Sequence, residues 1–278
     1  MKAWLQLIKY KLSLAVTITG LSLYLIQSGN IDPGLALTAF GIFLLASGAS
    51  ILNQYQEKEY DSLMERTSNR PLPSGTISPL NALFASALMI LAGSLLLLFL
   101  STAAAILGLV NILLYNLVYT RLKRISYLAI IPGALVGALP PLIGWFAAGA
   151  TELRAQVVFL SVLMFMWQVP HFWILVIKYN EDYQKAGFKS ILSIMNQGQV
   201  RRVVSAWIIL GTLLALSFPF FGLNPVTAIK WILLALCLVF IIMCNLSIFK
   251  RKTLTRAFIL SNIFIVLFFA LMALGYLL

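Results

Sequence analysis

Long apolar runs separated by short polar segments dominate this chain. Runs of about 20 apolar residues match the length at which an α-helix crosses a hydrocarbon core of ~30 Å. Their apolar residues are continuous and do not alternate with polar ones, which argues against a transmembrane strand barrel. The pattern therefore predicts an all-α polytopic membrane protein whose nine transmembrane helices cover residues of about 10–28, 34–55, 79–100, 102–120, 127–149, 155–178, 203–222, 226–248 and 256–278.

Composition supports the membrane assignment. The 278 residues are 61% hydrophobic and only 10% charged, which leaves too little polar surface to cover a water-soluble protein. We expect a single domain, residues 1–278, with the helices arranged around a central cavity.

The basic residues predict an orientation. With the N-terminus in the cytoplasm and nine spans, all of the 20 Lys and Arg residues except Arg154 and Lys230 fall on the cytoplasmic side. Positive charge concentrates on that side of membrane proteins. We therefore expect a cytoplasmic N-terminus, an external C-terminus, a cavity that opens to the cytoplasm, and a bacterial or archaeal cell membrane. The net charge of +12 is explained by topology, so no nucleic acid partner is predicted.

Acidic residues are scarce and clustered. Of the 8 Asp and Glu residues, all but Asp32 and Glu152 lie within residues 53–66 and 178–183. Both segments follow an apolar run and are predicted to be cytoplasmic. Carboxylates so close together repel one another unless a cation neutralises them, so the clustering indicates a cation site at the membrane surface.

The first acidic segment has helical spacing. Asn53, Glu57 and Asp61 share one face if the second span continues as a helix. Oxygen ligands of this kind suit Mg²⁺, which takes one or two carboxylates together with substrate phosphates. Arg66 and Arg70 follow, and guanidinium groups are forked donors for phosphate. The alternative is a solvated loop in which acidic and basic residues balance one another.

The second segment follows an aromatic stretch that contains a proline. Pro170 interrupts the hydrogen bonding of the sixth span, and His171, the only histidine, comes directly after it. A lone histidine in a membrane span is often a packing residue. Because His171 lies beside Gln168 and a proline, a cavity-lining role is favoured for it. Asp182 and Lys178 follow as a second metal or diphosphate contact.

Three motifs along the chain carry a family resemblance. They are Asn53-x-x-x-Glu57-x-x-x-Asp61 with Arg66-Thr67-x-Asn69-Arg70-Pro71; Tyr119-Thr120-Arg121-Leu122-Lys123-Arg124; and Trp167-Gln168-x-Pro170-His171-Phe172-Trp173 with Asp182-Tyr183 and Ala186-Gly187. Together they resemble the motifs of the UbiA-type intramembrane prenyltransferases and, more narrowly, of the subfamily that farnesylates heme b. The resemblance covers essentially the whole chain.

The resemblance implies a reaction and roles for individual residues. Farnesyl diphosphate and heme b are the expected substrates, Mg²⁺ is the expected cofactor, and a farnesyl group is expected to pass to a vinyl carbon of heme. A heme A synthase and a terminal oxidase are the candidate partners that would take up the product. The expected metal ligands are Asn53, Glu57, Asp61 and Asp182, with His171 as a further catalytic residue that contacts heme or positions water. The expected substrate contacts are Arg66, Arg70, Tyr119, Arg121, Lys123, Trp167, Gln168 and Lys178.

Two departures from the family pattern keep alternatives open. Glu57 stands where the superfamily often has Asp, and Phe188-Lys189-Ser190 replaces a Pro-containing run that many members of the subfamily carry after Ala186-Gly187. Transfer to another aromatic, chlorin or quinone-precursor acceptor is one alternative. Transport of an anionic metabolite is another, since proline kinks and intramembrane polar residues also mark transport paths. A scaffold role would leave the acidic clusters unexplained.

Overall fold

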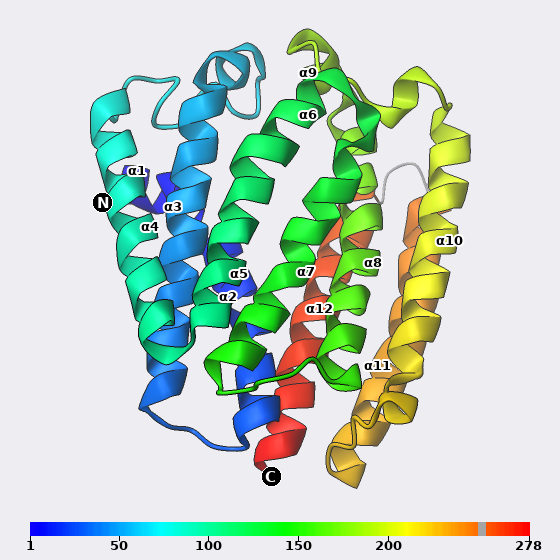
Figure 1. Ribbon diagram of the computed structural model, residues 1–278. Coiled ribbons are helices and arrows are strands. Elements are labelled where there is room, and N and C mark those ends of the chain that lie inside the picture. Colours follow the sequence, from blue (N-terminus) through cyan, green and yellow to red (C-terminus); the bar gives the residue numbers. More distant parts are fainter. Residues whose placement is uncertain (250–253) are drawn as a thin grey trace.

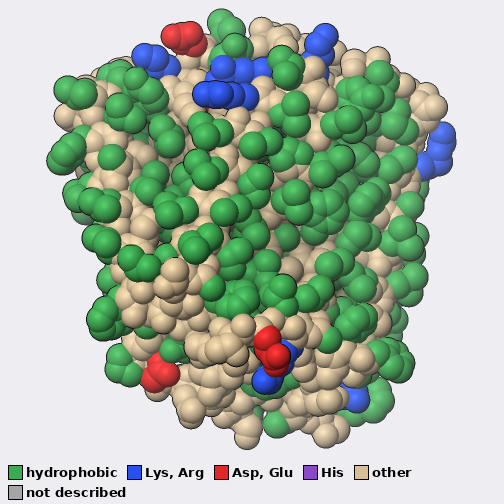
Figure 2. Space-filling view, viewed as in Figure 1, with side chains coloured by type: hydrophobic (Ala, Val, Ile, Leu, Met, Phe, Trp, Pro, Cys, Tyr) green, Lys and Arg blue, Asp and Glu red, His purple; other side chains and the backbone are tan. Residues whose placement is uncertain are grey.

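Helices account for the regular secondary structure in the part of the chain that the structure describes. This computed structural model describes residues 1–249 and 254–278, and no strand occurs among them. The long helices run alongside one another between the two ends of the bundle (Figure 1). On the face shown in Figure 2, hydrophobic side chains cover the middle, and charged side chains gather at the two ends. This distribution fits a multi-pass membrane protein, and it confirms the predicted fold class.

The helices follow the predicted order of spans. In the described residues they are α1 (Lys2–Leu7), α2 (Tyr10–Ser28), α3 (Pro33–Leu63), α4 (Pro79–Leu100), α5 (Thr102–Leu113), α6 (Thr120–Ile125), α7 (Ile130–Ala147), α8 (Ala155–Lys178), α9 (Asn180–Lys185), α10 (Gln197–Leu216), α11 (Thr227–Phe249) and α12 (Leu254–Leu277).

Contacts between neighbouring helices form a closed series. The long helices pack in chain order from α2 to α5, then α5 against α7, α7 against α8, α8 against α10, and onward to α12, which packs against α2. Helix α2 also packs against α7. The two backbones come very close there, because a Cβ atom added at Gly144 would lie 1.8 Å from the Gly20 carbonyl oxygen. Only glycine at position 144 permits this crossing.

Eight helical segments in the described residues are long and apolar enough to cross a membrane. Helix α2, 19 residues long, matches the predicted first span but does not belong to these eight. Its polarity comes from residues such as Ser13, Thr17 and Ser22, which are buried and donate hydrogen bonds to carbonyl groups at or near their own helical turn. A spanning helix can therefore carry these hydroxyl groups, because they face the bundle and are satisfied internally.

Two helix boundaries differ from the prediction. Helix α3 ends at Leu63 and not near residue 55, because no proline or glycine interrupts the polar residues that follow Asn53. Helix α10 begins at Gln197, six residues before the expected start, in what was predicted to be a loop. Asn196 and Gln199 form a reciprocal capping box there, which stabilises the first turn.

The short helices α6 and α9 and the C-terminus mark opposite ends of the bundle. Helices α6 and α9 lie at one end, and the C-terminus lies at the other (Figure 1). Three of the basic residues used to predict the orientation, Lys250, Arg251 and Lys252, lie outside the described residues.

Candidate active site

The last turns of α3 carry a buried row of polar side chains. Asn53, Glu57 and Asp61 are only 2%, 4% and 1% exposed, and they occupy one face of the helix. The continuation of the second span as a helix is thereby confirmed. Buried polar groups are costly unless they are partnered, and each of the three has a partner from another segment.

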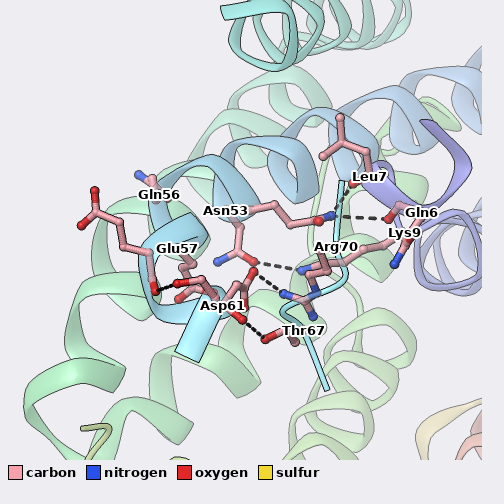
Figure 3. A network of polar contacts seen from close by, with 12 residues as sticks. Gln6, Leu7, Lys9, Asn53, Gln56, Glu57, Asp61, Thr67 and Arg70 are labelled. Carbon is pink, nitrogen blue, oxygen red and sulfur yellow. Dashed lines mark hydrogen bonds and ion pairs between the residues drawn. The ribbon is translucent and has the colours of Figure 1, made fainter. Parts of the chain in front are cut away.

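Asn53 is held from two sides. Lys9 Nζ donates to its Oδ1 atom at 2.9 Å, and its own Nδ2 group donates to Thr120 Oγ1 at 3.0 Å. Lys9 also donates to the Tyr115 hydroxyl at 3.3 Å. Figure 3 shows Lys9 directed at the row from the turn between α1 and α2. Sequence reasoning assigned Lys9 to topology alone and missed this contact.

The backbone at Lys9 is unusual. Its φ of 48° is the only positive value of a non-glycine residue in the described part of the chain. Non-glycine residues in the left-handed region carry strain, which persists only where surrounding structure enforces it. The pKa of Lys9 is lowered to about 7, chiefly by burial and next by the neighbouring Arg70, while Glu57 acts in the opposite direction. An additional anion nearby would favour the charged ammonium.

The two carboxylates form ion pairs with residues remote in sequence. Glu57 pairs with Lys123 of α6. Asp61 Oδ2 pairs with Arg70 Nη1 at 2.7 Å, as Figure 3 shows. Thr67 Oγ1 also donates to the Asp61 carbonyl oxygen at 2.9 Å. The other carboxylate oxygen of Asp61, Oδ1, is buried and has no hydrogen-bond partner among the described residues.

A π-helical turn, Leu114–Tyr119, separates α5 from α6. Such turns occur often at functional sites. This one directs Tyr115 and Tyr119 toward the row, with their rings stacked 5.8 Å apart. Tyr119 also packs against Phe172 of α8 at 5.7 Å, and the Lys123 ammonium lies 5.3 Å from the Tyr119 ring centre. The prediction had one uninterrupted span here.

Asp182 connects the second acidic segment to the first. Its carboxylate accepts the backbone N–H groups of Glu65 at 3.2 Å and Arg66 at 3.4 Å. The Arg66 guanidinium in turn lies 4.9 Å from the centre of the Tyr179 ring. Asp182 therefore holds the loop that follows Asp61, but none of its described contacts is with the carboxylates of Glu57 or Asp61.

The other predicted diphosphate contacts differ in position. Lys178 lies 4.9 Å from the centre of the Tyr179 ring, beside Arg66. Arg121 is exposed, and no described contact joins it to the row on α3. The structure thus gathers Arg66, Arg70, Lys123 and Lys178 around the two acidic segments and leaves Arg121 outside.

The aromatic stretch of α8 faces α12. His171 packs between Trp167 and Phe258, each 4.7 Å away between ring centres, and its Nδ1 atom is buried with no partner among the described residues. Trp167 donates its indole N–H to the Ser261 carbonyl oxygen at 2.8 Å. Gln168 lies against Gly137 of α7, where a Cβ atom would be 2.0 Å from Gln168 Nε2.

The oxygen groups of the row fit a cation that shares a phosphorylated ligand. No three His, Cys, Asp or Glu side chains within the described ranges lie close enough to hold a metal ion by themselves. Asp61 Oδ1 is nevertheless a buried acceptor without a donor. Magnesium commonly completes its coordination with phosphate oxygens and water, so the donor set matches a metal that binds together with a diphosphate.

Comparison with known proteins identifies the class. A family model described as the UbiA prenyltransferase family matches residues 13–272, and the chain belongs to this family. It is therefore a multi-pass membrane prenyltransferase. Among solved structures, the fold resembles digeranylgeranylglyceryl phosphate synthase, with a TM-score of 0.76, 20% identity, and coverage of 99% of this chain and 98% of that one. It also resembles a UbiA homolog from Archaeoglobus fulgidus bound to DMAPP and Mg²⁺, with a TM-score of 0.71, 16% identity, and coverage of 97% and 98%.

Sequence relatives with curated names point to a narrower group. The protoheme IX farnesyltransferase of Cytophaga hutchinsonii is 39% identical over 191 residues, which are 68% of this chain and 66% of that protein. The protein of the same name from Flavobacterium psychrophilum is 32% identical over 258 residues, 89% of this chain and 84% of the relative.

Replacing Asp182 should loosen the loop after α3. In Asp182→Asn, the carboxylate that accepts two backbone N–H groups loses its charge. Because hydrogen bonds to charged groups contribute ~1.5–3 kcal/mol, amide hydrogens in residues 65–70 should exchange about tenfold faster or more. Hydrogen exchange followed by mass spectrometry measures this. Glu181→Gln changes an exposed neighbour and should leave exchange unaltered; equal protection in both variants would contradict the assigned contact.

Proposed function

We propose that this chain transfers a farnesyl group from farnesyl diphosphate to a vinyl group of heme b and that water adds a hydroxyl group to the same side chain, giving heme O and releasing diphosphate, in a reaction that depends on Mg²⁺. The observation that carries the proposal is the buried row of Asn53, Glu57 and Asp61 with its three cations. The farnesyltransferase names of the relatives supply the substrates. Because the family match covers residues 13–272, we treat residues 1–278 as one catalytic domain.

The diphosphate would bind beside the row on α3. We assign Asn53, Glu57, Asp61 and Asp182 as ligands of magnesium that is shared with diphosphate oxygens. The UbiA homologs solved with DMAPP or GPP and Mg²⁺ support this assignment. When bound, the metal would stabilise the negative charge that develops on the leaving diphosphate.

Cationic side chains would complete the diphosphate site. Lys9, Arg70 and Lys123 already lie at the row, and Arg66 lies on the adjoining loop. Ammonium and guanidinium groups are strong hydrogen-bond donors to phosphate. We assign them to orienting the diphosphate and holding it as the allylic carbon–oxygen bond breaks.

Aromatic side chains would protect the farnesyl end. The ring of Tyr119 packs between those of Tyr115 and Phe172 beside the row. Their faces attract positive charge, and their bulk excludes water from an allylic cation. The heme b acceptor would lie toward His171 and Gln168, deeper in the bundle than the carboxylates. For His171, contact with heme and positioning of water are both compatible with a buried ring nitrogen that lacks a partner.

We assign the end of the bundle that carries α6 and α9 to the cytoplasm of a bacterial or archaeal cell. The cationic residues that surround both acidic segments lie at this end, as positive-inside topology requires. The product would then leave for a heme A synthase or a terminal oxidase in the same membrane.

Analysis of extracted heme tests the proposed function most directly. Cells that express the chain should accumulate a heme whose mass increases by a farnesyl group plus a hydroxyl group, seen by chromatography and mass spectrometry. Unmodified heme b together with a prenylated quinone precursor would favour the other acceptor class. No prenylated product from any acceptor, with uptake of an anion into vesicles, would favour transport.

Asp61→Asn should abolish most of the prenyl transfer. The change removes one of two carboxylates in the row and the ion pair with Arg70, so we expect turnover to fall by at least ~100-fold, as when one charge-stabilising group is lost from an active site. Product formation by purified protein at saturating Mg²⁺ measures this. Glu59→Gln lies on the same helix at an exposed position and should retain activity. Near-normal turnover of Asp61→Asn would refute the assignment.

Cysteine labelling should report the orientation. Single cysteines at Ser68, Ser126 and Asn196 should be protected from an impermeant reagent added outside intact cells, and cysteines at Thr151 and Asn224 should react, because the two sets lie at opposite ends of the bundle. Both native cysteines are buried, so labelling of the native protein gives the background signal. External labelling at position 68 would overturn the orientation.

His171→Ala should separate the acceptor from the donor. The residue packs among rings of α8 and α12, away from the ion pairs of α3. We therefore expect heme b binding or its prenylation to weaken several-fold, with Mg²⁺-dependent binding of a non-hydrolysable farnesyl diphosphate analogue unchanged. His171→Phe keeps the ring volume and serves as a packing control. If alanine alters neither affinity nor activity, His171 is a packing residue.

A further inference from the structure

A groove opens beside the active site, between the end of α6 and the segment after α9. It is open to solvent, has a volume of about 50 Å³, and is lined in part by the short 3-10 turns Tyr127–Ala129 and Ile191–Ser193. One wall is formed by Phe172 and Trp173 of α8. We call it the Lys189 groove, and its lining also includes Tyr119, Lys123, Tyr127, Lys189 and Ser190.

Two of the residues that line the groove belong to the active site. Lys123 lines it and pairs with Glu57 of the row on α3. Tyr119 lines it as well and packs against Phe172. A molecule that enters the groove therefore reaches the same residues that we assign to the diphosphate and the farnesyl group.

Lys189 brings to the groove a positive charge that has no carboxylate partner in the described residues. Its side chain is exposed, whereas Lys123 is paired with Glu57. Ser190, the next residue, is buried. The Ser190 hydroxyl accepts the Leu192 N–H at 3.1 Å, so it still has a proton to donate. A cation and a hydroxyl donor that line the same groove suit a carboxylate.

We propose that Lys189 and Ser190 bind a carboxylate of the acceptor, which for heme b is a propionate. This inference rests on the proposed function. Heme b carries its propionates on one edge of a flat ring and its vinyl groups elsewhere on the periphery. With a propionate at Lys189, the ring would lie along Phe172 and Trp173, and a vinyl group would be directed toward Tyr119 and Lys123.

The position of the groove agrees with the chemistry of such an acceptor. It is too narrow to enclose a whole tetrapyrrole, so the assignment concerns the carboxylate-bearing edge. That edge stays near the membrane surface, where a charged group costs least. Phe188-Lys189-Ser190 is also the segment in which this sequence departs from the subfamily it resembles, so the contact belongs to this chain and is not carried over from its relatives.

Paired binding measurements test the proposal. Purified full-length protein and the variants Lys189→Gln and Lys189→Arg would be titrated with heme b and with heme b dimethyl ester, in which both propionates are uncharged. Lys189→Gln should bind heme b about fivefold more weakly than the native protein, which is the upper range for an exposed ion pair. It should bind the dimethyl ester with the same affinity as the native protein. Lys189→Arg should retain affinity for heme b. Lys185→Gln, an exposed lysine in the same segment outside the groove, should match the native protein.

Several outcomes would overturn the proposal, and they can be told apart. Unchanged heme b affinity in Lys189→Gln, or equal weakening for acid and ester, would exclude a carboxylate contact. If Lys189→Gln loses heme b affinity only in vesicles with anionic lipid, and not in phosphatidylcholine vesicles, Lys189 contacts a lipid headgroup. Failure of the native protein to bind either heme would overturn the proposed function itself, whereas strong native binding that is insensitive to Lys189 would overturn this inference alone.

Discussion

The burial of two carboxylates in a helical membrane bundle is the constraint on which the rest of the site depends. Glu57 and Asp61 are almost inaccessible, and an unpaired ion in such surroundings costs several kcal/mol. Lys123 and Arg70 supply the opposite charges, and Lys9 supports Asn53 at the start of the row. These cations come from α6, the loop after α3 and the turn before α2. The ion pairs thereby fix three otherwise independent segments against α3.

The same requirement explains irregular features of the backbone. Lys9 reaches the row from a left-handed turn, and Tyr115 and Tyr119 reach it from a π-helical turn. In a continuous α-helix from α5 into α6, the residues after the turn would face other directions, because a π turn adds a residue to the repeat. Thr120 illustrates the result, since it donates to the Tyr115 carbonyl, five residues earlier, and accepts the amide of Asn53.

Local sequence predicted the spans and the row on α3, because both follow from periodicity along one helix. It did not predict Lys9, since its role depends on contacts with residues 44 and 106 positions away. Arg121 shows the converse, because its place in a motif beside Lys123 did not bring it to the site. The earlier start of α10 was accessible in principle, since Asn196 and Gln199 have capping-box spacing. The π turn has no comparable signal in its residues.

The charge balance of the site also explains how a metal and a diphosphate would depend on each other. The row holds its own counterions, so a divalent cation arriving alone meets Lys9, Arg70 and Lys123, and a diphosphate arriving alone meets Glu57 and Asp61. Each ligand alone is therefore repelled by the protein groups that carry a charge of its own sign. When the two arrive together, the cation compensates the carboxylates and the phosphates compensate the ammonium and guanidinium groups, which is electrostatically favourable on both sides. The absence of a three-carboxylate cluster among the described residues agrees with this, because a site built for joint binding has no need to hold the metal by itself.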